Sequence, residues 1–185
     1  MREAVLSHHT AGLSFSGALS LLAVVSVLVV VSVPHLSEIA LQENEADARG
    51  TAQILAGALQ ALDAKPRYQP SMRELLRFPE LRTLGDAELV AGDAVLRRHG
   101  YLFEVTCLSP GVTAPSAPAA LLSGESDALG AILAIRAWPW AHGTTGVAAF
   151  LATQEGGRLE HPNAVPHWEG LASAGSQLAS LEGWR

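Results

Sequence analysis

The chain has 185 residues, of which 49% are hydrophobic, 16% charged and only 5% aromatic, and its formal net charge is −6. This length allows one domain with a core, or one small domain with an appendage, and argues against two full domains. The composition is uneven, because residues 4–37 contain no Asp, Glu, Lys or Arg. A fully soluble chain is therefore unexpected, and so is one with several membrane spans, because no second such stretch occurs.

The charge and cysteine content limit the possible partners. The acidic balance and the scattered arginines argue against nucleic acid, which needs a clustered basic face to neutralise phosphates. Cys107 is the only cysteine. An intramolecular disulfide and a multi-cysteine metal centre are therefore excluded.

The charge-free stretch predicts a membrane-spanning helix. Residues 13–33 form an apolar run of 21 residues, which as a helix would extend about 31 Å, the thickness of a bilayer's hydrocarbon core. The alternative is a cleaved secretory signal peptide, but no Ala-x-Ala pattern precedes Pro34. Arg2 before the run weakly favours an N-terminus in the cytoplasm and a body outside it.

An amphipathic pattern continues beyond the apolar run and predicts a helix over residues 36–64. Five apolar residues fall on one helical face, and they are Ile54, Leu55, Ala58, Leu59 and Leu62. The two stretches could form one long helix, with a kink near Pro34.

The spacing of landmarks around this run resembles the type IV pilins and the pseudopilins of type II secretion. Gly12 would end a short leader, the apolar run starts at Leu13, Pro34 follows, and Asn44-Glu45-Ala46 lies ten residues further on. The downstream half is similar to pilin-like proteins that have a small antiparallel sheet. Its matching motifs are Gly100-Tyr101-Leu102-Phe103, Ala137-Trp138-Pro139, Gly143-Thr144-Thr145-Gly146, Phe150 and Glu155-Gly156-Gly157-Arg158.

The resemblance implies a structural, non-enzymatic subunit without a cofactor. A prepilin peptidase would cleave between Gly12 and Leu13, and the helix would then stay in the inner membrane or pack against other pilin-like subunits, with the head outside the cytoplasm. It also implies roles in the assembly helix for Gly17, Pro34, Asn44 and Glu45. The expected regions are a leader (1–12), a transmembrane or assembly helix (13–34), an α+β head (35–161) and a flexible tail (162–185).

Position 17 departs from the family pattern and keeps a second hypothesis open. Filament-forming members usually carry a glutamate where this chain has Gly17, and a charge in an apolar core is costly unless it is paired. Its absence suggests a minor or tip subunit of a type IV pilus or type II pseudopilus. The alternative is a membrane-anchored binding or sensor module that no longer assembles.

The remaining chain predicts an α+β fold, in which the long helix packs on a small antiparallel sheet. Residues 70–77 are expected to form a short helix stopped by Pro79, and residues 86–96 one or two further turns. Alternation from Gly100 to residue 106 predicts a half-buried strand, and a flexible loop is expected over 109–127. Further strands are expected over 131–138, 147–153 and 158–161.

Few residues suggest a metal site, a catalytic site or a binding site. The seven histidines lack metal-ligand spacing with carboxylates and are expected to be solvated at the surface. Neither a nucleophile motif nor a phosphate-binding loop is present. Trp138 and Trp140 flank Pro139 and are expected to face the same side, as a core or edge pair or as a contact patch for a partner.

Overall fold

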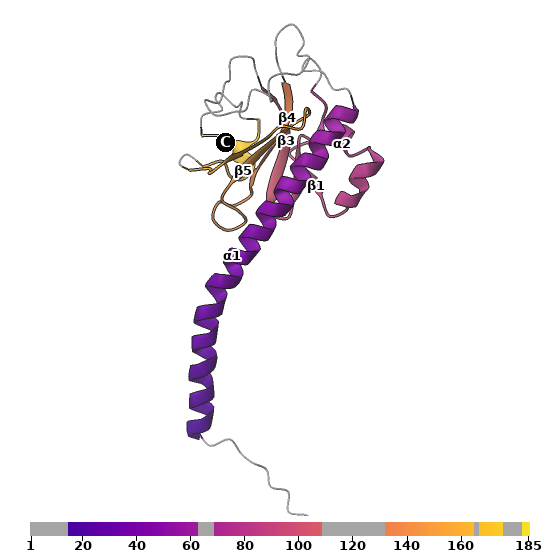
Figure 1. Cartoon of the computed structure of the whole chain (residues 1–185). Helices are drawn as coiled ribbons and strands as arrows, with labels where there is room; N and C mark the ends of the chain where they lie inside the picture. Colours follow the sequence, from indigo (N-terminus) through magenta and orange to yellow (C-terminus); the bar gives the residue numbers. More distant parts are fainter. Residues whose placement is uncertain (1–14, 63–68, 109–131, 165–166, 176–182) are drawn as a thin grey trace, which may run out of the picture. The chain divides into compact units, whose positions relative to one another are not determined.

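The protein has a long apolar N-terminal helix and a six-stranded antiparallel sheet, which confirms the predicted α+β class (Figure 1). The computed structural model describes residues 15–62, 69–108, 132–164, 167–175 and 183–185. The chain divides into two units, residues 1–39 and residues 40–185. Helix α1 (Phe15–Ala61) contributes to both, and each unit is described separately below.

The sheet is an antiparallel meander whose spatial order equals its chain order, β1-β2-β3-β4-β5-β6. Its strands are β1 (Glu88–Val90), β2 (Val95–Arg98), β3 (Tyr101–Leu108), β4 (Ile132–Pro139), β5 (Ala149–Thr153) and β6 (Arg158–His161). β3, β4, β5 and β6 lie where the sequence predicts strands. The predicted loop 109–127 lies outside the described residues.

The prediction of helical turns over residues 86–96 is wrong, because β1 and β2 form a hairpin there. Its turn places Ala91, Gly92 and Asp93 at φ of 52°, 65° and 73°. The left-handed region is uncommon for residues with a Cβ, so Ala91 and Asp93 gave no turn signal. Residues 79–84 form a 3₁₀ helix that begins at Pro79, a position where the missing N–H costs no hydrogen bond.

The short helix predicted over residues 70–77 is α2 (Met72–Leu75). The Ser71 hydroxyl accepts a hydrogen bond from the Glu74 backbone, and the Glu74 carboxylate accepts one from the Ser71 N–H at 2.8 Å. This capping box satisfies N–H groups that the helix itself cannot pair. α2 is therefore anchored locally, and its buried Met72 and Leu75 reach the core.

Residues 40–61 of α1 pack on one face of the sheet (Figure 1). Leu55 and Leu59 are fully buried, and Ala58 is nearly so, as the helical periodicity predicts. Ile54 and Leu62 belong to the same predicted face but are 44% and 36% exposed. The buried face instead includes the small residues Ala48, Thr51, Ala52 and Ala56, which allow the helix backbone to approach the sheet closely.

The sheet is buried on both faces, so the prediction of a half-buried strand from Gly100 to residue 106 is wrong. Tyr101, Phe103 and Val105 of β3 contribute to the core beneath α1. The alternate residue Leu102 contributes to a second core together with Trp138 and Trp184. The second face is covered by residues that sequence analysis assigned to a flexible tail.

Candidate functional site at the junction of α1 and the sheet

Asn44 and Glu45 attach α1 to the loop between β4 and β5. The Asn44 side-chain amide donates to the Thr145 carbonyl at 3.0 Å. One oxygen of Glu45 accepts the backbone N–H groups of Val147 at 2.8 Å and Ala148 at 3.1 Å. The structure therefore gives both residues intrachain partners, and their role in assembly stays a prediction.

Tyr101 fixes the same loop from the sheet side. Its hydroxyl donates to the Ala148 carbonyl at 3.0 Å, and the side chain is completely buried. Burial raises the pKa of Tyr101 far above that of a free tyrosine, and the Glu45 carboxylate acts in the same direction. A Cβ on Gly146 would lie 2.0 Å from the Tyr101 Oη, so only glycine allows this approach.

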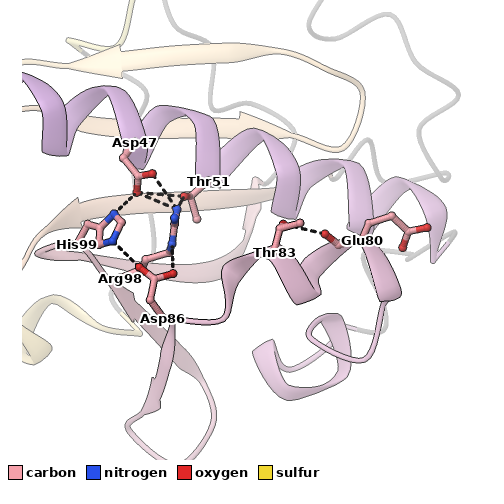
Figure 2. Close-up of polar contacts among 7 residues, drawn as sticks. All are labelled: Asp47, Thr51, Glu80, Thr83, Asp86, Arg98 and His99. Carbon is pink, nitrogen blue, oxygen red and sulfur yellow. Dashed lines mark hydrogen bonds and ion pairs between the residues drawn. The ribbon is translucent and has the colours of Figure 1, made fainter.

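A charged cluster lies beside this loop and joins α1 to the turn between β2 and β3 (Figure 2). Arg98 donates through Nη1 to both oxygens of Asp47 at 2.9 Å and through Nε to Asp86 at 2.8 Å. Arg98 also contacts the Thr51 hydroxyl. The hydrogen bond from Arg98 holds the pKa of Asp86 below its usual value.

His99 completes the charged cluster and lies between its two carboxylates. Its Nδ1 is 3.1 Å from Asp47, and its Nε2 contacts Asp86. The backbone of His99 has φ of 42°, which turns the side chain back toward α1. The imidazole is 49% exposed, as expected for a histidine at a surface turn, and its contacts with two carboxylates are what the sequence did not indicate.

The predicted assembly residues Gly17 and Pro34 belong to the N-terminal part of α1. Residues 15–39 are described as continuous helix, with Pro34 inside it, and the Ser37 hydroxyl donates to the Pro34 carbonyl at 2.7 Å. The large apolar side chains of this part are exposed. This helix is long and apolar enough to cross a membrane. The predicted processing residues Gly12 and Leu13 lie outside the described residues.

Trp138 and Trp140 face the same side, as predicted, and both contribute to the second core. Trp138 is fully buried, and its Nε1 donates to the Gly170 carbonyl at 3.0 Å. For Trp138 the structure favours the core alternative, and a role of Trp140 as a contact patch for a partner stays a prediction. Trp140 is partly buried beneath the Arg97 guanidinium, which lies 4.7 Å from the ring centroid.

A buried ion pair between Glu104 and Arg136 lies at the centre of the second face. Arg136 also donates to the Ser173 carbonyl at 2.7 Å, and Glu104 accepts the Gly175 N–H at 2.8 Å. Burial lowers the pKa of Arg136, and the Glu104 charge opposes this effect. Sequence analysis missed the pair, because Glu104 alternates with apolar residues as a solvent-facing residue would.

The C-terminal segment, residues 162–185, is not the flexible tail that the sequence predicts, at least in its described residues. Asn163 is buried, and Trp184 is 1% exposed in the second core. The Trp168 and Trp184 rings stack at 5.6 Å, and the His142 and His167 rings stack at 3.9 Å. The composition of the segment, rich in Ala, Gly and Ser, gave no sign of this packing, because many of the contacts are made by the backbone, as at Gly170, Ser173 and Gly175.

Two features of the described residues bear on catalysis. None of them form a group of three or more His, Cys, Asp or Glu side chains that could hold a metal ion. Burial raises the pKa of the Cys107 thiol, which disfavours the reactive thiolate. A groove of about 190 Å³ lies between α1 and β5–β6, and Arg49, Phe150, Arg158 and Arg185 are among the residues that line it.

Three comparisons with known proteins gave no match: no family model, no curated protein and no solved structure matches this chain. The class of protein is therefore defined by the structure alone. It is an α+β protein with one N-terminal helix that could cross a membrane and an antiparallel sheet covered on both faces.

Proposed function

We propose that the chain is a structural, pilin-like subunit, anchored in the inner membrane by the N-terminal part of α1 with its head outside the cytoplasm. It would assemble into, or at the tip of, a type IV pilus or a type II secretion pseudopilus. The observation that carries this proposal is that the two parts of α1 differ in their surroundings. Residues 15–33 expose apolar side chains, whereas Asn44, Glu45 and Asp47 attach the same helix to the sheet.

The exposed apolar side chains supply a physical mechanism for assembly. An apolar helix is kept out of water in a bilayer, and it is also kept out of water where neighbouring helices surround it in a filament. Transfer between these two environments would therefore not expose the apolar side chains to water. The contacts of Asn44 and Glu45 would keep the C-terminal part of α1 packed on the sheet during that transfer.

Processing by a prepilin peptidase is tested by measuring the mass of the chain in the membrane fraction. In a host with an active prepilin peptidase, we expect a chain that begins at Leu13. Gly12→Glu is expected to retain residues 1–12, because the resemblance implies a leader that ends in glycine. A wild-type chain that still begins at Met1 in that host would contradict the proposed processing.

Anchoring and orientation are tested by labelling a single cysteine in intact cells. Cys107→Ala removes the partly buried native thiol, and Glu155→Cys places a new thiol in the exposed turn between β5 and β6. A membrane-impermeant maleimide is expected to label this variant without lysis once the outer membrane is permeabilised. Labelling only after the inner membrane is disrupted would place the head in the cytoplasm and contradict the proposal.

A membrane-anchored binding or sensor module is the second candidate, and Gly17 favours it. Residues 15–37 carry no acidic side chain that could pair with the N-terminal amine of a neighbouring subunit. Incorporation into sheared filaments discriminates the two functions. A structural subunit is expected in the sheared fraction, and Gly17→Glu should raise its share, whereas a non-assembling module stays in the membrane in both forms.

A further inference from the structure

The last described residues, Gly183, Trp184 and Arg185, lie against the outermost strand of the sheet. Arg185 and Glu160 of β6 exchange two backbone hydrogen bonds, of 2.9 Å and 3.0 Å. Reciprocal bonds of this kind characterise a pair of residues in an antiparallel ladder. The outer edge of β6 therefore binds Arg185 through its backbone, and pairing at a sheet edge is the chemistry of strand addition.

Trp184 gives this contact a side-chain anchor. Its indole is 1% exposed, and its ring centroid lies 5.6 Å from that of Trp168 and 5.4 Å from that of His161. Large aromatic side chains in fully desolvated slots supply much of the energy of peptide and protein interfaces. The slot accepts an indole from a segment that is otherwise at the surface, since Gly183 and Arg185 are both exposed.

Gly183 makes the site selective for sequence. Its φ is +81°, and a Cβ at this position would lie 2.5 Å from the His161 Nε2. Backbone strain and this collision both exclude other residues. The site thus requires glycine at one position, tryptophan at the next, and a backbone that can pair with Glu160 at the third.

We propose that this site is a docking site for a Gly-Trp-Arg segment, and that the Gly183–Arg185 segment of a second copy can occupy it in place of the chain's own. Among the residues that the structure describes after residue 175, Gly183, Trp184 and Arg185 supply the contacts with His161, Trp168 and Glu160. Exchange of these residues between two copies would reproduce each of the contacts, because swapping an identical element between copies creates no new kind of contact. This interaction does not require filament assembly, so its failure leaves the proposed function untouched.

The test uses the full-length chain in detergent micelles, with and without residues 183–185. The probe is a fluorescently labelled peptide of residues 180–185, Ser-Leu-Glu-Gly-Trp-Arg, and binding is followed by anisotropy. The shortened chain is expected to bind it saturably. The intact chain is expected to bind at least about tenfold more weakly, because its own segment fills the site most of the time. A peptide with alanine in place of glycine is expected not to bind.

A second variant keeps the test decisive if the shortened chain fails to fold. Gly183→Ala in the intact chain retains Trp184 but disturbs the seated segment, so this variant is expected to bind the peptide more tightly than the wild type. Gly143→Ala is the matched control, because Gly143 has φ of +74° but a Cβ there meets no atom within 4 Å. Binding that is equal in all folded chains, or absent from all of them, overturns the docking site.

The second copy as occupant is tested separately by sedimentation in detergent. The shortened chain mixed with the intact chain is expected to form a one-to-one species, which excess unlabelled peptide dissociates. If the peptide binds the shortened chain but the intact chain forms no such species, exchange between copies is refuted.

Discussion

Glu104 on β3 and Arg136 on β4 lie directly opposite each other in the sheet and form an ion pair beneath the C-terminal segment. Each partner also binds the backbone of that segment, at Gly175 and at Ser173. Two buried charges are tolerated because each neutralises the other and because hydrogen bonds satisfy them. The pair thereby selects the position at which the C-terminal segment covers the sheet.

Removing one member of this pair should destabilise the protein strongly. Arg136→Met leaves the Glu104 carboxylate buried and unpaired, so we expect a loss of about 3–5 kcal/mol in the free energy of unfolding. Urea denaturation in detergent, followed by circular dichroism, measures the loss. The double variant Glu104→Met/Arg136→Met should recover most of it, and a double variant as unstable as the single one would contradict this account.

Replacing Glu45 should loosen the loop between β4 and β5. Glu45→Ala leaves the N–H groups of Val147 and Ala148 without their acceptor, at a cost of about 1–3 kcal/mol. Hydrogen exchange at these two amides is expected to accelerate, while exchange in β3 changes little. Glu43→Ala is the matched control, because Glu43 is an exposed acid of the same helix, and its exchange pattern should remain that of the wild type.

Two glycines should respond in opposite directions to the same substitution. Gly146→Ala places a Cβ within 2.0 Å of the Tyr101 Oη, and we expect a lower thermal midpoint. Gly57→Ala on α1 meets nothing within 4 Å and should stabilise the helix by up to about 1 kcal/mol. Similar shifts for both variants would refute the close packing between Gly146 and Tyr101.

Stability should fall at alkaline pH because of Tyr101. Burial raises the pKa of Tyr101 in the folded state, whereas in the unfolded chain a tyrosine ionises near pH 10. Above about pH 10 the unfolded state therefore loses a proton that the folded state retains, and the free energy of unfolding decreases with pH. Tyr101→Phe should be less stable at neutral pH but show a shallower decline between pH 9 and pH 11, measured by urea denaturation.

Acid should weaken the charged cluster through Asp86. Because Arg98 lowers the pKa of Asp86 in the folded state, the stabilisation is present above the ordinary aspartate pKa of about 4 and is lost as the pH falls through the folded value. The urea midpoint measured from pH 6 to pH 2.5 should fall less in Asp86→Asn than in the wild type. Parallel curves for the two proteins would rule out this contribution.

The elements that sequence analysis predicted correctly can be recognised from the residues of a single segment. β4 and β5 contain runs of apolar residues bounded by glycine or proline. The N-terminal part of α1 is recognised as an apolar helix because residues 15–37 contain no Asp, Glu, Lys or Arg. β1 and β2 were missed because three and four residues are too few to establish an alternation. Their turn also adopts left-handed backbone at Ala91 and Asp93, which composition does not indicate.

The candidate site was less predictable because its contacts join distant parts of the chain. Asn44 and Glu45 were selected by resemblance, yet nothing local indicates that they bind Thr145, Val147 and Ala148. The burial of Trp138 likewise depends on Trp184 and on the carbonyl of Gly170. Long-range pairs of this kind leave no periodic trace in either of the segments that they connect.

The location of the tryptophans makes the two faces of the sheet distinguishable by spectroscopy. All four indoles of the chain lie in the second core or pack against it, and the core beneath α1 contains none. Intrinsic fluorescence excited at the indole band therefore reports on the face covered by the C-terminal segment and is nearly blind to the helix side. Release of that segment would change the emission, whereas loss of α1 would change the helical signal, so one sample can resolve the order in which the two layers separate.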